Sequence, residues 1–119
     1  MVLMEKARQK ALEIPYEKGK ERLYAIIVSK RGLILSEASN SYIKTSPVML
    51  NNALEVGDDT KPFWHAECLA IHRLKNPDIA HKIVICRVNK QGELRNAKPC
   101  KICENAIKKT NIKIVEYSL

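Results

Sequence analysis

The sequence lacks several features that would place it in particular classes of protein. No apolar run approaches the roughly 20 residues that a membrane span needs. The N-terminal stretch MVLMEKARQKALEIP lacks the apolar core of a signal peptide. The chain also has no internal repeat, low-complexity segment or linker. We therefore expect one domain over residues 1–119 that has no membrane partner. We expect it in the cytoplasm, where cysteine thiols stay reduced.

Aromatic residues are scarce, at 5% of the chain, which disfavours a long platform for stacking nucleic-acid bases. Positive charge, by contrast, is abundant. Lys and Arg number 21 against 13 Asp and Glu, which gives a formal net charge of +8. This balance suits a polyanionic or phosphorylated partner. The alternative is a solvated basic surface with no specific partner, because net charge governs association and not fold.

Hydrophobic periodicity predicts a helix followed by a β-hairpin in the first third of the chain. Apolar residues recur at helical spacing over residues 2–18, with Lys, Arg and Glu on the other faces. Two apolar stretches rich in β-branched residues then follow at 23–30 and 33–39. The dipeptide Arg31-Gly32 separates them, so they read as two strands joined by a tight turn.

The rest of the chain predicts a long loop and then alternating helices and strands. Residues 40–62 are polar and interrupted by Pro and Gly, so we expect a functional loop with one helical turn near Val48–Leu54. A helix, a strand, a helix and a strand are expected next, at residues 65–75, 81–89, 99–110 and 112–119. The last strand–helix–strand unit requires two parallel strands. The predicted fold class is an α/β protein, a three-layer α/β/α sandwich on a mixed four- to five-stranded sheet.

A CxxC motif, Cys100 to Cys103, stands at the start of the helix expected at 99–110. Two thiolates at this spacing can reach one ion, and the positive end of a helix stabilises them. A thioredoxin-like redox pair would instead follow the first strand of its fold. A closed Cys₄ zinc site would need a second CxxC, which the chain lacks. The motif therefore indicates a metal site that needs a third ligand from elsewhere.

His65 is the leading candidate for that third ligand, because it also stands at a predicted helix start. Three protein ligands leave tetrahedral zinc one open position for water, as in catalytic sites. Glu67 follows His65 by two residues, so its carboxylate can lie beside that water and carry its proton. The sequence thus predicts zinc as the cofactor, held by His65, Cys100 and Cys103, with Glu67 as the catalytic residue.

The other cysteines and histidines fit this site less well. The pattern HExxH is absent around His65. Cys68 and His72 lie on the same predicted helix but further from its N-terminus, where the other ligands are expected. We therefore expect Cys68 in the core and His72 outside the site. We likewise expect His81 at the surface or in the core, and Cys86 buried within its strand.

The paired motifs, HxE at residues 65–67 and PCxxC at 99–103, resemble the signature of the cytidine deaminase-like superfamily. The order of elements from residue 23 to residue 119 also resembles the core of that family. A histidine as the first ligand is similar to the deoxycytidylate, tRNA adenosine, polynucleotide cytosine and guanine deaminases. The small tetrameric cytidine deaminases usually have cysteine there. The chain looks similar to compact deaminase-like proteins of phage and bacterial genomes.

This resemblance implies hydrolytic removal of an amine from a nucleobase, with zinc activating water and Glu67 moving protons. It also implies substrate contacts. Asn40 corresponds to an asparagine that contacts the sugar or base, and the backbone at Ala66 and Pro99 would line the pocket. Phe63 and Trp64 are candidates to stack on the base, with core packing as the alternative. Independently of the resemblance, the positive charge includes three lysines near the site that could hold either one phosphate or a strand of them: Lys44, Lys61 and Lys98.

Three functions remain open from the sequence. The first is a zinc-dependent deaminase of a cytosine nucleoside or nucleotide, of the CMP or dCMP type, whose partner is that substrate. The second is a deaminase of cytosine or adenine within single-stranded DNA or RNA, which the positive charge favours. The third is a non-catalytic zinc-stabilised domain that binds nucleic acid, against which the presence of Glu67 weighs. Assembly into a homo-oligomer is left open.

Overall fold

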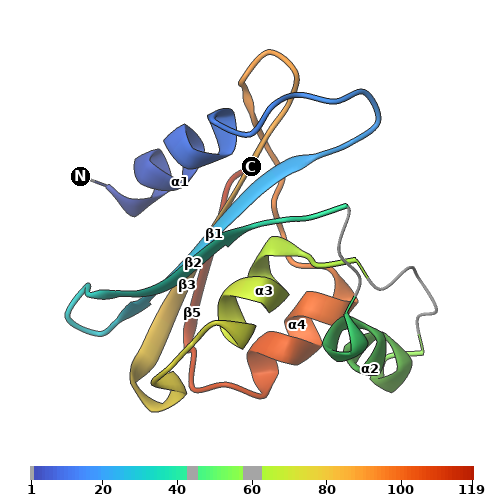
Figure 1. Ribbon diagram of the computed structural model, residues 1–119. Helices are drawn as coiled ribbons and strands as arrows, with labels where there is room; N and C mark the ends of the chain where they lie inside the picture. Colours follow the sequence, from blue (N-terminus) through green and yellow to red (C-terminus); the bar gives the residue numbers. More distant parts are fainter. Residues whose placement is uncertain (1, 43–45, 58–62) are drawn as a thin grey trace.

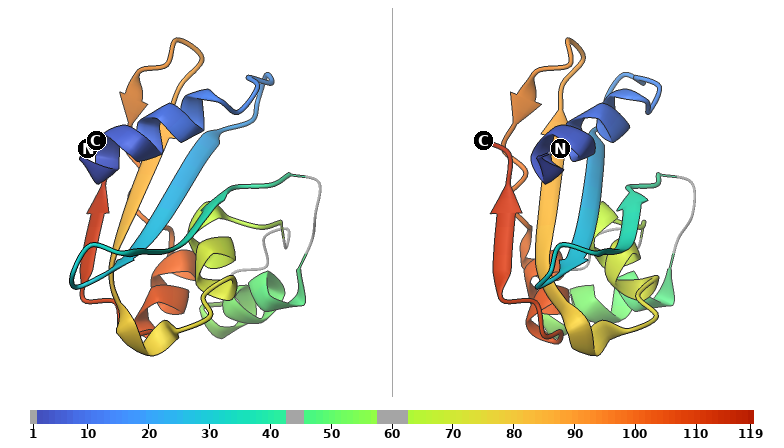
Figure 2. Two further views of the ribbon diagram at one scale, coloured as in Figure 1. Left: turned by 60° about the vertical axis from the view of Figure 1, so that its left-hand side comes forward. Right: turned by 90° about the vertical axis from the view of Figure 1, so that its left-hand side faces the viewer.

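The computed structural model describes residues 2–42, 46–57 and 63–119, which form a five-stranded sheet with helices on both faces (Figure 1). The strands run in the spatial order β2–β1–β3, and both β4 and β5 pair with the far edge of β3. Figure 2 shows this order with the sheet face in view. The strand bounds are Arg22–Ser29 (β1), Ile34–Ser39 (β2), Ala80–Val88 (β3), Leu94–Arg95 (β4) and Ile114–Tyr117 (β5).

The sheet is mixed, as the sequence predicts. β1 and β2 form the expected antiparallel hairpin, whose turn contains Gly32 at a φ of +88°, a conformation that favours glycine. β3 is antiparallel to β1 and to β4. β3 and β5 are parallel and are connected through helix α4 (Lys101–Lys108). The strand–helix–strand crossover predicted near the C-terminus is therefore confirmed.

Side chains of the central strand β3 alternate between two cores. Val84 and Cys86 face helix α1 (Leu3–Leu12), whose Ala7 and Ala11 are fully buried against the sheet. Ile83 and Ile85 face the opposite side, where helix α3 (Ala66–His72) contributes Ala66 and Ala70. Since both faces of β3 are covered, its sequence is almost continuously apolar. Figure 1 shows α1 alone on one face and the remaining helices on the other, which confirms the three-layer arrangement.

Helix α1 is shorter than the helix predicted over residues 2–18, because it ends at Leu12. Pro15 explains the difference. A proline cannot donate a backbone hydrogen bond, and it disfavours helical geometry in the residue before it, here Ile14. The helical spacing of apolar residues extends past this point, but the backbone cannot follow it.

The segment predicted as a loop over 40–62 with one helical turn near Val48–Leu54 contains a longer helix at that place, α2 (Pro47–Glu55). Its start has a favourable cap, since Ser46 Oγ accepts hydrogen bonds from the amides of Val48 (3.1 Å) and Met49 (3.5 Å). Pro47 occupies the first helical position, where its missing N–H costs nothing. These capping signals are present in the sequence, so the helix was predictable. The short edge strand β4 was also not predicted, and its two residues carry little strand signal.

The remaining described elements complete the layers without adding a membrane segment. A short 3₁₀ helix at Pro77–Ile79 leads from α3 into β3. Among the described residues, no helix combines the length and apolar character that crossing a bilayer requires.

Replacing Ile85 with alanine should lower the free energy of unfolding by about 2–5 kcal/mol, because the side chain is fully buried in the core beneath α3. The measurement is equilibrium unfolding in urea. Ile114→Ala in β5 is the matched control. Ile114 is 45% exposed, so the loss should stay below about 1 kcal/mol. Equal losses of unfolding free energy in the two variants would contradict the conclusion that Ile85 faces the core beneath α3.

Candidate metal centre

Two helix starts bring the predicted metal donors together. His65 is the N-cap residue of α3 and Cys100 is the N-cap residue of α4, and neither side chain makes a capping hydrogen bond. Both imidazole and thiol are therefore available for another role. Helices α3 and α4 pack through a shared cluster that includes Cys68, Ile102 and Cys103. Packing between the two helices thus places residues far apart in the chain at one point.

The distances among these donors fit a zinc ion. His65 Nδ1 lies 3.2 Å from Cys103 Sγ and 3.5 Å from Cys100 Sγ. The three ligand atoms all lie within 4.8 Å of one another. A tetrahedral zinc ion separates a nitrogen and a sulfur ligand by about 3.6 Å, given bonds of about 2.1 and 2.3 Å. One imidazole and two thiols are also donors that zinc prefers. The donor set and its spacing therefore both suit zinc.

Proton sharing within the group favours negative charge on one sulfur. A hydrogen bond with the Cys103 thiol, helped by His65, lowers the pKa of Cys100 to about 4. Hydrogen bonds with Cys100 and Cys68, together with burial, raise the pKa of Cys103. The hydrogen bond with Cys100 raises the pKa of His65. Because thiolate and not thiol ligates metal, Cys100 stands ready as a ligand at neutral pH.

Glu67 lies in the first turn of α3 and is only 4% exposed. Burial raises the pKa of its carboxyl group, and its own backbone amide and His65 partly offset that rise. Its side chain lines the same cavity as His65 and Cys100. A buried carboxyl with a raised pKa beside a metal centre is suited to accept and return a proton.

The cavity at this centre has a volume of about 430 Å³, within the range of about 300–1,000 Å³ that is typical of small-molecule sites. Four of the predicted substrate contacts line it: Asn40, Phe63, Trp64 and Ala66. Pro99 does not, although its neighbours Lys98 and Cys100 do. Lys44 and Lys61 lie outside the described residues. The cavity thus joins the metal donors to most of the side chains expected around the substrate.

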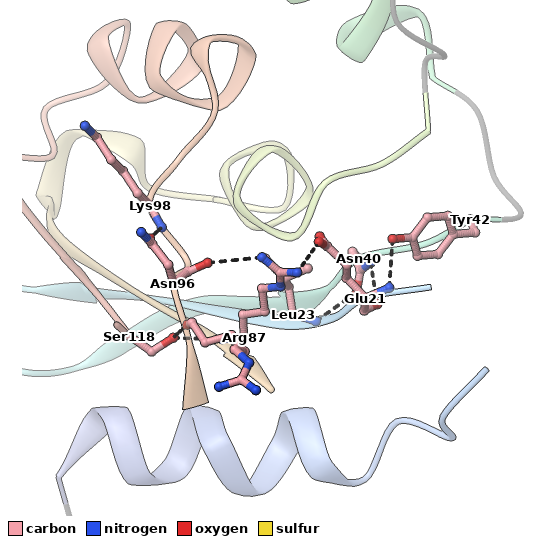
Figure 3. Close-up of polar contacts among 9 residues, drawn as sticks. Glu21, Leu23, Asn40, Tyr42, Arg87, Asn96, Lys98 and Ser118 are labelled. Atoms are coloured by element: carbon pink, nitrogen blue, oxygen red, sulfur yellow. Dashed lines mark hydrogen bonds and ion pairs between the residues drawn. The ribbon is translucent and has the colours of Figure 1, made fainter. Parts of the chain in front are cut away.

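Asn40 is held between the two strands of the hairpin (Figure 3). Its Oδ1 accepts a hydrogen bond from the backbone amide of Leu23 at 3.1 Å, and its Nδ2 donates to the carbonyl of Glu21 at 3.1 Å. These two bonds use one of the two hydrogens on Asn40 Nδ2 and one of the two lone pairs on its Oδ1. A substrate contact by Asn40 remains a prediction, and the bonds show that the side chain also fixes the start of β1.

Trp64 is packed as well as exposed to the cavity. Its ring lies with its centroid 5.1 Å from that of the His72 imidazole, and it also packs against the core cluster between α3 and α4. His72 is the exposed last residue of α3 and lies outside the three-donor group. The two alternatives considered for Trp64, base contact and core packing, are compatible in this position.

Cys86 and His81 lie away from the three-donor group, whereas Cys68 is buried as expected but contacts one of the donors. Cys68 is 2% exposed, and its Sγ lies 3.6 Å from Cys103 Sγ. Cys86 is fully buried against α1 on the far side of the sheet. His81 lies in β3 beside a separate cavity at the other end of that strand.

Five polar residues of the cavity were not predicted from the sequence: Glu21, Ser41, Tyr42, Arg87 and Asn96. A signal existed for Arg87. Residues at alternate positions of a strand share one face, and Arg87 continues the row of Ile83 and Ile85 that covers the core beneath α3. A charged residue in that row marks the point where the helices no longer cover the sheet. The other four residues carry no comparable signal.

Comparison with known proteins agrees with the geometry of the site. A search of curated proteins found no match to this chain. A family model described as the cytidine and deoxycytidylate deaminase zinc-binding region matches residues 1–119. This family comprises zinc-dependent deaminases, and the histidine and two cysteines brought together here are positioned to hold its metal ion. The chain therefore belongs to the cytidine and deoxycytidylate deaminase family.

Proposed function

We propose that this protein hydrolyses the exocyclic amine of cytosine in a nucleoside or nucleotide, which yields uracil and ammonia. One observation carries the proposal. The donor atoms of His65, Cys100 and Cys103 lie within 4.8 Å of one another, and His65 and Cys100 line a cavity that the buried Glu67 also lines. A zinc centre that serves structure alone needs four closed ligands and no neighbouring carboxylate. Family membership supports the same class of reaction.

In the proposed mechanism, His65, Cys100 and Cys103 would hold zinc, which would supply a water molecule of lowered pKa as the nucleophile. Glu67 accepts a proton from that water on a carboxylate oxygen. It then delivers the proton to ring nitrogen N3 as the water oxygen bonds to C4, and carries the second proton of that oxygen to the amine as the C4–N bond breaks. The balance is one water consumed and one ammonia released. Burial of Glu67 supports this role, since it raises the pKa of the carboxyl group.

The walls of the cavity are suited to a planar base. Phe63 and Trp64 supply aromatic surface, and Ala66 is a small residue at the first position of α3. Contact of Trp64 with the core fixes its ring, so that a bound base would meet a rigid surface. We propose that these side chains bind the base and exclude water from around Glu67.

A panel assay tests the substrate class. Zinc-loaded protein is expected to release ammonia from cytidine, deoxycytidine or their monophosphates, with the matching uracil compound as the second product. Adenosine, guanosine and single-stranded oligonucleotides complete the panel. Protein without zinc serves as the control for each substrate. The proposal would be contradicted if the protein turned over purine substrates but did not turn over any cytosine compound.

The second candidate is deamination within single-stranded DNA or RNA, which the net charge of +8 favours. Lys98 lines the cavity and is exposed. A strand neutralised by several Lys and Arg side chains releases counterions, so its binding weakens steeply as salt increases. A mononucleotide makes fewer such contacts, so its KM should change much less. Oligonucleotide turnover above that of any nucleotide, with a steep salt slope, would favour this candidate over the first.

A further inference from the structure

We propose that Arg87 binds the phosphate group of a mononucleotide substrate, and that Glu21 holds the guanidinium in place before the substrate arrives. This inference rests on the proposed deaminase function and specifies its substrate, a nucleoside 5′-monophosphate in preference to a nucleoside. Arg87 is thus a specificity-determining residue within the cavity that contains the metal donors.

The position of Arg87 follows from the register of the sheet. Arg87 pairs with Leu23 of β1, and both residues line the cavity together with His65 and Glu67. Its neighbours on the same face of β3, Ile83 and Ile85, are fully buried under the helices. The half-buried Arg87 therefore lies in the wall of the same cavity that His65, Glu67 and Cys100 line.

Contacts with Glu21 and Asn96 hold the guanidinium, and a third contact, with Ser118, anchors the backbone of Arg87 (Figure 3). Nη2 lies 2.5 Å from Glu21 Oε1, at the start of β1. Nη1 donates to the carbonyl oxygen of Asn96 at 3.4 Å, just after β4. The backbone amide of Arg87 donates to Ser118 Oγ at 3.0 Å, just after β5. The charge is therefore oriented before any ligand binds, which lowers the entropy cost of binding.

Glu21 is itself positioned by two residues of the cavity. Its backbone amide donates to the Tyr42 hydroxyl at 3.0 Å, and its backbone carbonyl accepts from Asn40 Nδ2 at 3.1 Å. Asn40 and Tyr42 thus tie the end of β2 to the residue that pairs with Arg87. The arrangement is a connected polar network along one wall of the cavity, and not an isolated surface ion pair (Figure 3).

The ion pair is weak enough to open for a phosphate. The side chains of Arg87 and Glu21 are 36% and 47% exposed, and exposed pairs contribute only about 0–1 kcal/mol. A guanidinium has five N–H donors, of which the contacts to Glu21 and Asn96 use two. A phosphate accepts two parallel hydrogen bonds from arginine, a stronger interaction of well-matched geometry. Exchange of the carboxylate for phosphate, or sharing of the guanidinium between them, is therefore favourable.

The test compares cytidine with cytidine 5′-monophosphate in wild type, Arg87→Gln and Glu21→Gln. Arg87→Gln is expected to lower the ratio of kcat/KM for the monophosphate over the nucleoside by about 10- to 100-fold, the effect of losing a hydrogen bond to a charged group. Glu21→Gln keeps an oxygen that can accept a hydrogen bond from the guanidinium but removes the competing negative charge, so it should keep or increase that ratio. A merely structural ion pair would affect both substrates alike in both variants.

Arg95→Gln is the matched control. Arg95 lies opposite Arg87 in the register of β3 and β4, its side chain is 53% exposed, and it does not line the cavity. Its replacement removes the same charge and should leave the ratio unchanged. A fall in the ratio as large as that of Arg87→Gln would mean that net charge alone sets the preference, and it would overturn the proposal.

Calorimetric binding separates failure of this inference from failure of the proposed function. Zinc-loaded wild type is expected to bind cytidine 5′-monophosphate more tightly than cytidine, and Arg87→Gln should lose that difference even if no turnover is detected. Equal affinity of the wild type for the two compounds would overturn the phosphate site and leave deamination intact. An effect of Arg87→Gln that is confined to oligonucleotides would overturn the assignment to a free mononucleotide.

Discussion

Replacement of Glu67 by glutamine will leave zinc bound and the fold intact, while kcat falls by about 10²–10⁴-fold or more. Glutamine has nearly the same size as glutamate, but it cannot accept a proton from water and return it to the base. Glu67 is 4% exposed and lines the cavity of the metal donors, so bulk water offers no ready substitute. The measurements are steady-state kinetics, zinc content and thermal unfolding of the same preparation.

Glu104→Gln provides a matched control for this prediction. Glu104 also lies in the first turn of its helix, α4, but its side chain is 54% exposed and pairs with Lys108 at 3.7 Å. If Glu67 served only to favour its helix dipole, each glutamine variant would lose about 0.3–1 kcal/mol of stability and keep most of its activity. Substantial turnover by zinc-loaded Glu67→Gln, similar to that of Glu104→Gln, would therefore exclude the proton-carrying role.

Replacement of Cys100 by serine will reduce the zinc content from about one equivalent per chain to a small fraction of that value. A serine hydroxyl is a poor zinc ligand, and the two remaining donors hold the ion weakly. Cys100 is the exposed member of the group, so the change itself should cost the fold little. Zinc stabilises the folded state by about 4 kcal/mol when its free concentration is 1,000 times Kd. A chelator should therefore lower the Tm of the wild type but hardly that of Cys100→Ser.

Cys68→Ala is the control that tests the choice of thiols. Cys68 Sγ lies 3.6 Å from Cys103 Sγ, close enough that distance alone does not dismiss it as a ligand. Cys68 is nevertheless buried in the cluster between α3 and α4, and it falls outside the group whose donor atoms all lie within 4.8 Å. Zinc content should stay near one equivalent in this variant. Loss of zinc in Cys68→Ala, or full activity of metal-free wild type, would show that the ligand set is wrong.

Local sequence determined most of the helices and strands, because hydrophobic periodicity and turn residues act within a few positions along the chain. The run of apolar residues in β3 specified a central strand, and Arg31-Gly32 specified the hairpin turn. Two further local signals in the sequence were hidden by the hydrophobic periodicity from which the helices were predicted. Pro15 ends α1 earlier than predicted, and the Ser46-Pro47 cap begins a helix, α2, where a loop with one helical turn was predicted. In both places a capping or helix-breaking residue outweighs the apolar pattern.

The identity of the metal donors could also be predicted from sequence, because chemistry restricts the choice. Few side chains ligate zinc, and the paired motifs place three of them at helix starts. What sequence alone cannot supply is their distance. His65 is 35 residues from Cys100 and 38 from Cys103, and separations of 3.2–3.5 Å arise only because α3 and α4 pack on each other.

The tertiary structure alone decided which polar residues share the cavity. Glu21, Tyr42 and Arg87 come from three places in the chain, and none belongs to a motif with its own chemistry. Their meeting depends on the register of β1 against β3 and on the end of β2, both of which follow from packing across the whole sheet. Sequence by itself thus determined most of the elements and the candidate metal donors, and it singled out Glu67 as the proposed proton carrier. Long-range packing, which no local pattern encodes, determined the wall of the cavity where a phosphate is proposed to bind.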